Sequence, residues 1–396
     1  MMATRRSRST SRRQFLQGSA GLGILLGAGV PILGACGGGD DATGGERPDP
    51  IADGLEPEAG PLRIFNFADY VAPDTIAGFE AKYGVKVEVT TYDSDSEAVS
   101  RIASGAVKVD LHHSAATSTL YKYIDSGLAR PLNKSYIPNL VNVRKSLLDP
   151  QYDPGNEYTV PYNLFTTGIG YRADRIDPAQ VEEQGWDLIW NPEYKGSVSI
   201  LDDEREAITM ALLRKGIKDA NVSDAKQIEE ALADLQELIN LVNVKVNITG
   251  YTDVPEGNTT VAHTWNSDMV GAQFYLPDGV GPEVLGFWYP ADDIGVVNHD
   301  TMMVMANAEH PVLAHLYIDY ITDLANAETN AAWLGYLPAI EGFDADFMIN
   351  QGYVPENLRR AVTTDDMIAK GLPMNRLDTD TEILYEDTWS KFKSGG

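Results

Sequence analysis

The sequence predicts a two-lobed α/β protein with a ligand cleft between the lobes. Strand patterns alternate with helical patterns twice, first over residues 62–126 and again over residues 167–265. Such alternation is typical of mainly parallel sheets that carry helices on their faces. The chain has 396 residues, which is enough for two domains of ordinary size. It has no P-loop and no GxGxxG turn, so the expected small-molecule site is the interface between the lobes.

The first α/β unit carries clear helix boundaries. A helix is predicted over 73–83, because Pro73 suits the first helical turn and Gly84 suits a helix end. Ser94 and Glu97 have the spacing of a capping box that opens the next helix. The other elements predicted here are strands at 62–67, 85–92 and 107–112 and a helix that ends at Ser126.

The second unit contains an acidic strand–helix junction. A short β-branched run at 198–201 predicts a strand, and a helical run follows it. Asp203 and Glu206 are three residues apart, so they share one face of the first helical turn. They form a capping-box-like pair at a helix start, but they also lie where α/β proteins commonly bind ligands. These residues alone leave both interpretations open.

The remaining body of the chain also shows regular patterns. A helix over 224–242 has an apolar stripe of Ile228, Leu232, Leu235 and Ile239. A break at Val160-Pro161-Tyr162 separates the two units. The other predicted elements are strands at 167–171, 244–248, 260–265 and 301–306 and helices at 311–324, 325–334 and 381–393.

The charge excludes some partners. The formal net charge is −27, with 58 acidic against 31 basic residues. Such a surface repels nucleic acid and anionic membranes and attracts cations to an acidic cleft, although solubility or a salty habitat would also explain the excess. The single cysteine excludes an intramolecular disulfide and a cysteine-based zinc site.

The N-terminus has the pattern of an export signal. Residues 11–16 (SRRQFL) resemble a twin-arginine signal, and the apolar stretch that follows ends at 33–36 (LGAC), which resembles a lipobox. Cys36 is therefore the predicted lipidation site, and the body is expected outside the cytoplasm. Residues 36–60 are rich in Gly and Pro and are predicted to be a flexible tether.

No catalytic or metal-binding arrangement emerges from the sequence. Ser-His-Asp, Cys-His and HExxH arrangements cannot be assembled. His112 and His113 are neighbours on a predicted strand, so they point to opposite faces and cannot chelate one ion together. His310 and His315 are expected on a helix surface. We therefore expect no cofactor and no metal.

Acidic and aromatic side chains instead gather at predicted strand ends, and this set suits an elongated organic cation. Carboxylates form charge-assisted hydrogen bonds with ammonium groups. Aromatic faces pack on methylenes and attract the charge at ~0.5–2 kcal/mol each. Singly, each residue also fits a core, turn or cap role. The set comprises Phe67, Asp69 and Tyr70, then Asp203 and Glu206, then Trp265, and finally Asp300.

These residues lie in stretches that resemble the polyamine (spermidine/putrescine) solute-binding proteins of bacterial ATP-binding-cassette importers. The resemblance covers about residues 62–396, and the stretch at 186–206 is its most specific part. The matching stretches are 64–71 (IFNFADYV), 91–94 (TYDS), 160–162 (VPY), 190–196 (WNPEYKG), 203–206 (DERE), 265–266 (WN), 306–308 (ANA) and 335–336 (GY).

The resemblance implies a two-lobed clamp of the second periplasmic-binding-protein type, with lobe 1 at 62–164 and 298–338 and lobe 2 at 165–297 and 339–396. The clamp would close on its ligand by a hinge motion and present the closed form to a permease, whose ATPase supplies the energy. We expect a lipid-anchored monomer that is not an enzyme. The residues that match the family's amine-binding carboxylates are Asp69, Asp203, Glu206 and Asp300, and those that match its aromatic contacts are Phe67, Tyr70, Trp265 and Tyr336.

The sequence departs from the family pattern in the aromatic set. The family usually has Trp at Phe67, Ser and Tyr near Ala115 and Thr117, another Trp near Asn298, and a Gln near Asn375. The acidic set is complete, which favours a cationic ligand. Asp203 could both cap its helix and bind the ligand.

The alternatives are a different small solute such as another organic amine, a ligand sensor with the same clamp, and an extracytoplasmic hydrolase that uses Asp203 and Glu206. Glycosidase carboxylates flank their substrate from opposite sides, so the hydrolase fits these two residues poorly.

Overall fold

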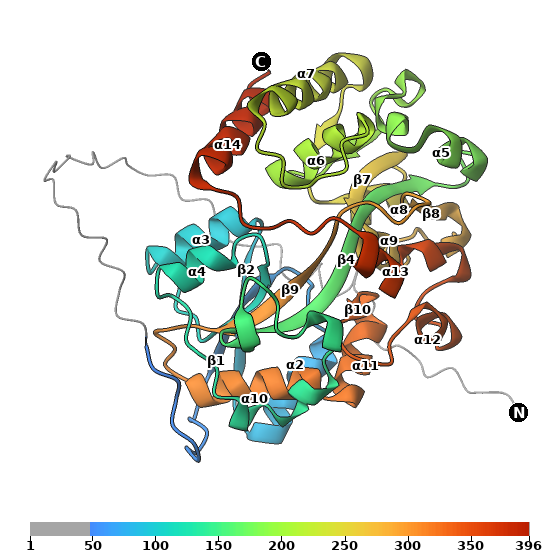
Figure 1. The fold of residues 1–396 in the computed structure, drawn as a ribbon. Helices are drawn as coiled ribbons and strands as arrows, with labels where there is room; N and C mark the ends of the chain where they lie inside the picture. The colour runs from blue at the N-terminus through green and yellow to red at the C-terminus, as the bar shows by residue number, and fades with distance from the viewer. Residues whose placement is uncertain (1–47, 396) are drawn as a thin grey trace, which may run out of the picture.

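The computed structural model describes residues 48–395, in which two lobes share one sheet (Figure 1). Lobe 1 is the half built on β1, β2 and β3, and lobe 2 is the half built on β5, β6 and β7. The sheet order is β2 (Val87–Tyr92), β1 (Leu62–Phe67), β3 (Leu111–Ala116), β9 (Val297–Val304), β4 (Thr159–Arg172), β7 (Val261–Trp265), β5 (Val198–Ile200) and β6 (Lys245–Val246), with β8 (Leu285–Trp288) and β10 (Leu337–Pro338) paired to β4.

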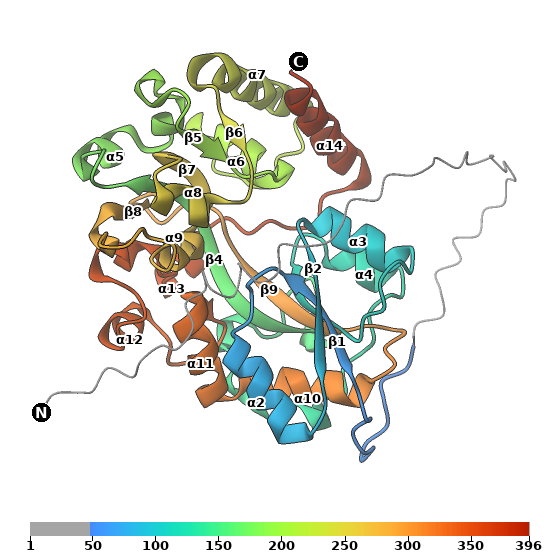
Figure 2. The same ribbon diagram turned by 180° about the vertical axis from the view of Figure 1, so that it is seen from behind.

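Helices cover both lobes, and views from opposite sides show lobe 2 stacked on lobe 1 (Figures 1 and 2). Within residues 48–395, no helix combines the length and apolar character needed to cross a membrane. Lobe 1 carries α2 (Pro73–Tyr83), α3 (Asp95–Ala103), α4 (Leu120–Asp125), α10 (Pro311–Thr322) and α11 (Leu324–Leu334). Lobe 2 carries α5 (Pro178–Gln184), α6 (Glu204–Arg214), α7 (Ala225–Val242), α8 (Gly250–Glu256), α9 (Asn266–Ala272) and α14 (Thr379–Lys393). Two further helices, α12 (Ala345–Asn350) and α13 (Asp365–Lys370), lie near the junction of the lobes.

The expected parallel pairing holds only at the two ends of the sheet. β1 pairs in parallel with β2 and β3, and β5 pairs in parallel with β6 and β7. The central strands are antiparallel, because β4 runs from lobe 1 into lobe 2 and β9 returns beside it. The lobes are therefore joined by two long neighbouring strands (Figure 1).

The predicted break at Val160-Pro161-Tyr162 is wrong, because β4 runs through it without interruption. Pro161 cannot donate a backbone hydrogen bond, and the register between β4 and β9 shifts between Pro161 and Leu164, as expected for an irregularity that accommodates proline. The first part of β4 pairs with β9 and β10, and its second part pairs with β7 and β8. The predicted change of lobe near Leu164 falls within this shared strand.

Local helix signals in lobe 1 are largely confirmed. Helix α2 has Pro73 in its first turn and ends at Gly84, whose φ of 70° suits glycine. The Ser94 hydroxyl accepts a hydrogen bond from the Glu97 backbone N–H at 3.2 Å. The Glu97 carboxylate, however, accepts from the Asp93 N–H rather than from Ser94, so the capping box is half formed.

The third strand lies four residues later than predicted. Residues before Leu111 are held in a loop by the buried Asp110 carboxylate. Asp110 accepts hydrogen bonds from the backbone N–H groups of Arg63 (2.9 Å) and Glu309 (2.8 Å). Its side chain also lies 3.0 Å from His310 Nδ1, and His315 is fully buried, so the expectation that both histidines lie on a helix surface is wrong. A long-range contact therefore determines where this strand begins.

Lobe 2 has its own buried cluster around α6 and α7. Asp224 caps α7 through hydrogen bonds from the Lys226 and Gln227 N–H groups. Ile228 and Leu235 of the predicted stripe are buried, but Ile239 is 37% exposed. The face that packs on the lobe is therefore rotated toward Leu238, which is fully buried.

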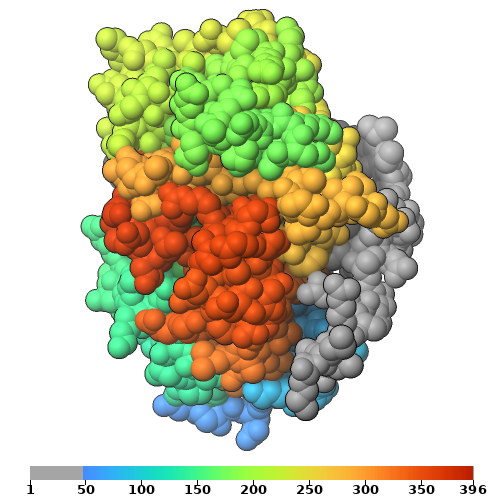
Figure 3. All heavy atoms as spheres, turned by 90° about the vertical axis from the view of Figure 1, so that its right-hand side faces the viewer, coloured from blue at the N-terminus to red at the C-terminus, as the bar shows by residue number. Residues whose placement is uncertain are grey.

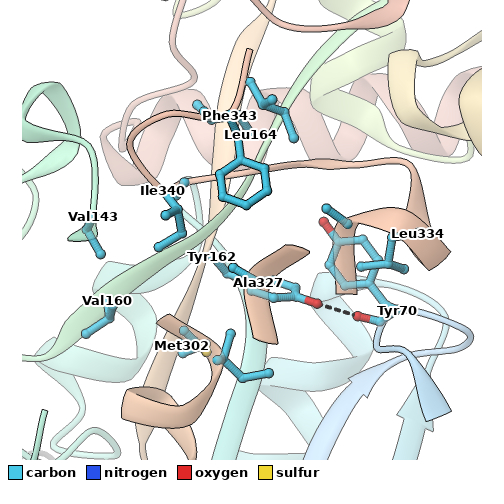
Figure 4. Packing of buried hydrophobic residues seen from close by; sticks show 14 of the residues in the cluster. Tyr70, Val143, Val160, Tyr162, Leu164, Met302, Ala327, Leu334, Ile340 and Phe343 are labelled. Atoms are coloured by element: carbon cyan, nitrogen blue, oxygen red, sulfur yellow. Dashed lines mark hydrogen bonds between the residues drawn. The ribbon is translucent and has the colours of Figure 1, made fainter. Parts of the chain in front are cut away.

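The segment after β10 packs on both lobes. Ile340 and Phe343 lie beside Leu164 of β4 in a cluster that also contains Met302 of β9 (Figure 4). On the face shown in Figure 3, the orange-to-red segment covers the junction between the lobes. This segment, predicted to be part of lobe 2, therefore shares a core with the strands that connect the lobes.

Part of the predicted tether lies against lobe 1. The Glu58 carboxylate accepts hydrogen bonds from the Val312 (3.0 Å) and Leu313 (2.9 Å) N–H groups at the start of α10. A carboxylate is favourable there because the first N–H groups of a helix lack intrahelical partners. Residues 48–60 are thus not a free tether, while the signal segment at 1–35, Cys36 and the first part of the tether lie outside the described residues.

Candidate ligand-binding site

A cavity of about 800 Å³ lies between the lobes, within the size range of small-ligand pockets. Seven of the eight predicted binding residues line it, namely Phe67, Tyr70, Asp203, Glu206, Trp265, Asp300 and Tyr336. The eighth, Asp69, is not among the lining residues and occupies the β1–α2 loop with a φ of 54°. The neighbouring Ala68 lines the cavity instead.

The lobe 1 wall is built around a tyrosine–aspartate pair. The Tyr70 hydroxyl donates a hydrogen bond of 2.5 Å to Asp300 Oδ2 on β9. Tyr70 is held in place because the Tyr162 hydroxyl donates to its backbone carbonyl at 2.8 Å (Figure 4). Burial raises the pKa of Asp300 to about 7, and the hydrogen bond from Tyr70 partly opposes this rise. Asp300 therefore lies at the threshold of ionisation near neutral pH.

Aromatic rings continue this wall. Tyr70 contacts Tyr336 edge-on, with ring centroids 4.9 Å apart, and Phe67 lies 6.2 Å from Tyr70 in a similar geometry. Phe67 also packs on Tyr92, which lines the cavity although the sequence pattern did not identify it. The aromatic set is consequently larger than the family pattern predicted, since Tyr92, Tyr121, Phe165 and Tyr251 also line the cavity.

The lobe 2 wall begins at the α6 N-terminus. Asp203 caps this helix, because its Oδ1 accepts a hydrogen bond of 2.9 Å from the Glu206 N–H. Glu206 does not complete a capping box: its Oε1 accepts from the Thr167 hydroxyl (3.0 Å) and from the indole N–H of Trp265 (3.1 Å). The other oxygen, Oε2, is buried and has no hydrogen-bond partner among the described residues.

Both carboxylates of this pair have raised pKa values. Glu206 is only 4% exposed, and burial followed by the negative charge of Asp203 raises its pKa. Burial is also the main cause of the raised pKa of Asp203, opposed by the hydrogen bond from the Glu206 N–H. A cation placed beside these groups would favour their ionised forms. Asp203 is therefore a cap and a cavity residue at once.

Asp268 is a cavity carboxylate that the sequence analysis missed. It lies on α9, three residues after Trp265, and accepts hydrogen bonds from the Tyr336 hydroxyl (3.2 Å) and the Thr264 hydroxyl (3.0 Å). Burial raises its pKa to about 7. The signal was present in the sequence, because Trp265 and Asp268 repeat the strand-to-helix spacing of Asp203 and Glu206.

Asp95 and Glu204 also line the cavity and were not predicted. Asp95 is the first residue of α3, and its Oδ1 is buried with no hydrogen-bond partner in the part of the chain that the structure describes. Burial and then the charges of Asp300 and Asp203 raise its pKa well above the usual range. The pKa of Glu204 is raised by burial and by Asp203. The acidic lining thus extends further than the sequence pattern indicated.

The bases that line the cavity already have partners of their own. Lys122 pairs with Glu382, and Lys393 pairs with Asp202 at 2.8 Å. The Arg205 guanidinium donates to the carbonyl of Ala220 at 3.0 Å and lies over the Tyr385 ring. Within residues 48–395, no salt bridge reaches six of the cavity carboxylates, namely Asp95, Asp203, Glu204, Glu206, Asp268 and Asp300.

This acidic lining suits an extended organic cation better than a single ion. Buried carboxylates are costly unless a positive charge or several hydrogen bonds compensate them. Within the described part of the chain, no group of three or more His, Cys, Asp or Glu side chains converges to hold a metal ion. The carboxylates are instead spread along a cavity that aromatic rings share, which matches a chain of amines separated by methylenes.

Other contacts join the lobes at the edge of the cavity. Arg376 pairs with Asp125 of α4 at 2.7 Å and lies over the Tyr121 ring, with 4.4 Å to its centroid. The Tyr121 hydroxyl donates to Glu382 of α14 at 2.6 Å. These contacts connect lobe 1 with the C-terminal part of lobe 2, and the Tyr336–Asp268 hydrogen bond connects Tyr336 with α9 of lobe 2. The Arg376–Asp125 pair is exposed to solvent, so an opening of the lobes would break it at modest cost.

Comparisons with known proteins agree with this arrangement. The profile of a family described as bacterial extracellular solute-binding protein matches residues 74–352. The spermidine/putrescine-binding periplasmic protein of Salmonella typhimurium is 28% identical over 343 residues, covering 84% of this chain and 92% of the relative. The protein of the same description from Escherichia coli is 30% identical over 280 residues, covering 69% of this chain and 76% of the relative.

A solved structure shows the same fold. The spermidine/putrescine ABC transporter substrate-binding protein of Streptococcus pneumoniae superposes with a TM-score of 0.68 at 24% identity, covering 84% of this chain and 98% of that chain. At this level of identity the likeness concerns the fold.

Proposed function

The chain belongs to the family of bacterial extracellular solute-binding proteins, and from this premise we propose that it captures a polyamine-like organic cation, such as putrescine or spermidine. The observation that carries the proposal is the set of six cavity carboxylates that no base within residues 48–395 pairs with. The printed descriptions of the relatives, which name spermidine and putrescine, support the same ligand class.

The proposed contacts follow from the two walls. Amines of the ligand bind Asp300 in lobe 1 and Asp203, Glu206 and Asp268 in lobe 2 through charge-assisted hydrogen bonds. Trp265 contacts the methylenes of the ligand, as do the rings of Phe67, Tyr70 and Tyr336. Asp69 would reach the ligand only if the β1–α2 loop rearranged when the lobes close.

Because the carboxylates belong to both lobes, a bound cation neutralises both walls and favours the closed clamp. The closed form is then delivered to an ABC permease, and the partner ATPase supplies the energy of import. Binding and delivery require no bond to be made or broken in the solute, so we propose no catalytic role. We further propose export by the twin-arginine route, lipidation at Cys36 and action as a monomer.

A ligand panel tests this function. The purified protein is heated with putrescine, spermidine, spermine, neutral and acidic amino acids, and betaine. A ligand present at 100 times its dissociation constant should add ~2.7 kcal/mol to the free energy of unfolding. We expect the melting temperature to rise with the polyamines. A rise with a neutral or anionic solute, and none with any cation, would show that the proposal is wrong.

A further inference from the structure

Asp95 occupies a position in the cavity that the proposed contacts leave unused. It begins α3 in lobe 1, directly after the capping residue Ser94, and lines the cavity with one oxygen buried and unpartnered. The carboxylates that act on it most strongly are Asp300 of its own lobe and then Asp203 and Glu204 at the start of α6 in lobe 2. The starts of α3 and α6 thus present carboxylates to each other across the cavity.

The number of carboxylates exceeds what a diamine can neutralise. Putrescine carries two positive charges, whereas the cavity has six carboxylates that no base in the described part of the chain pairs with. A carboxylate left unneutralised in a buried site must either stay protonated or remain as a costly charge. A cation with a third or fourth amine removes this cost at additional positions. Charge complementarity therefore favours the longer cations.

We propose that Asp95, with Asp203 and Glu204 across the cavity, forms an additional amine subsite that makes the protein prefer cations with three or more amines over diamines. This inference rests on the proposed function and concerns the same cavity. It assigns to Asp95 a role in specificity, because a diamine held by Asp300 and Asp268 would leave the subsite between α3 and α6 without a cation.

The same geometry links ligand charge to closure. In the empty protein, the carboxylates on the two lobes oppose each other's ionisation across the cavity. An ammonium group between them favours the ionised form on both lobes and attracts both. A triamine or tetraamine should consequently close the lobes more effectively than a diamine, which has no amine for this position.

The test is an Asp95→Asn variant studied by calorimetry with putrescine, spermidine and spermine at one salt concentration. We expect spermidine and spermine to lose roughly 10- to 100-fold in affinity, the scale of a charge-assisted hydrogen bond, and putrescine to lose less than about threefold. The melting temperature of the empty variant should rise, because a carboxylate whose ionisation burial and the neighbouring acids oppose has been removed. A merely structural role for Asp95 would lower it.

Asp74→Asn is the matched control, since Asp74 is also an acidic residue in the first turn of a lobe 1 helix but is exposed and outside the cavity. It should leave all three affinities unchanged. Glu204→Gln is the second variant and should reproduce the selective loss from the lobe 2 side, so the inference stays testable if Asp95→Asn folds poorly.

The outcomes separate this inference from the proposed function. An equal loss for diamine and triamine, or an unchanged ratio between them, would overturn the role of Asp95 while polyamine binding by the wild-type protein still stands. Failure of the wild-type protein to bind any polyamine would instead overturn the proposed function and this inference with it.

Discussion

The two walls of the cavity obtain their carboxylates in different ways. In lobe 2, a strand ends and a helix starts with an acidic residue in its first turn, and this device occurs twice, at Asp203–Glu206 and at Trp265–Asp268. In lobe 1, Asp300 lies within β9 and is paired with Tyr70, which is 230 residues away along the chain. The lobe 2 wall is thus encoded locally, whereas the lobe 1 wall exists only after the sheet has formed.

The difference also concerns how each charge is compensated. Glu206 has two side-chain donors, and Asp203 sits at a helix N-terminus, where the helix dipole favours negative charge. Asp300 has one side-chain donor, the Tyr70 hydroxyl. We therefore expect the lobe 1 wall to depend more strongly on single residues than the lobe 2 wall.

The largest expected effect comes from Asp300→Asn, which leaves lobe 1 without the carboxylate that Tyr70 positions. Polyamine affinity should fall by ~2–5 kcal/mol, the cost of removing one partner of a buried charged contact. Asp203→Asn should cost only ~1–3 kcal/mol, because Glu206 and Glu204 remain beside it and asparagine preserves the helix cap. Calorimetry with spermidine measures both, and a larger loss for Asp203→Asn would reverse the comparison.

The pH dependence should show which carboxylates must ionise. Asp300 and Asp268 have pKa values of about 7 in the empty protein, above those of the unfolded chain. Their contribution to stability is therefore present in acid below about pH 4 and is lost as pH rises through 7. A bound ammonium favours the ionised form, so affinity should increase about ten- to a hundredfold from pH 5.5 to 7.5, with protons released on binding.

Calorimetry in buffers of different ionisation enthalpy counts these protons, and the polyamine amines stay protonated over this range. Asp300→Asn should remove part of the pH dependence and part of the proton release. Affinity that is constant from pH 5.5 to 7.5 would contradict the assignment of these two residues.

The smallest expected effect concerns single hydroxyl groups. Tyr70→Phe removes the one side-chain donor of Asp300 and should weaken spermidine binding by ~1–2 kcal/mol. Thr167→Val removes one of two donors of Glu206 and should cost only ~0.5–1 kcal/mol. The same calorimetric measurement checks both variants, and equal losses would mean that the two walls do not differ in this respect. Their melting temperatures provide the control for folding.

Much of the local structure could be predicted because it depends on adjacent residues. Pro73 and Gly84 bound α2 as expected, and Asp203 caps α6, one of the two roles that the sequence left open for it. The errors arose where distant groups decide. Pro161 lies within a strand because β9 and β10 pair with that part of the chain, and β3 begins late because Asp110 holds the loop before it.

The candidate site divides in the same way. Asp203, Glu206 and Trp265 were found from patterns in the sequence, and Asp268 could have been found from the same spacing. Asp95 could not, since residues 94–97 indicate only a helix cap and the carboxylates facing Asp95 come from β9 and α6. Asp69 was expected in the cavity but lies in a loop outside its lining.

The sequence by itself thus determined the α/β pattern, most helix starts and ends, the acidic character of the protein and the carboxylates at the start of α6. It could do so because capping, turn formation and strand periodicity are interactions between near neighbours. Only the tertiary structure decided which acids meet across the cavity and which groups already hold the bases that line it. Burial and the proximity of distant charges set those properties, and both depend on how the two lobes pack around β4 and β9.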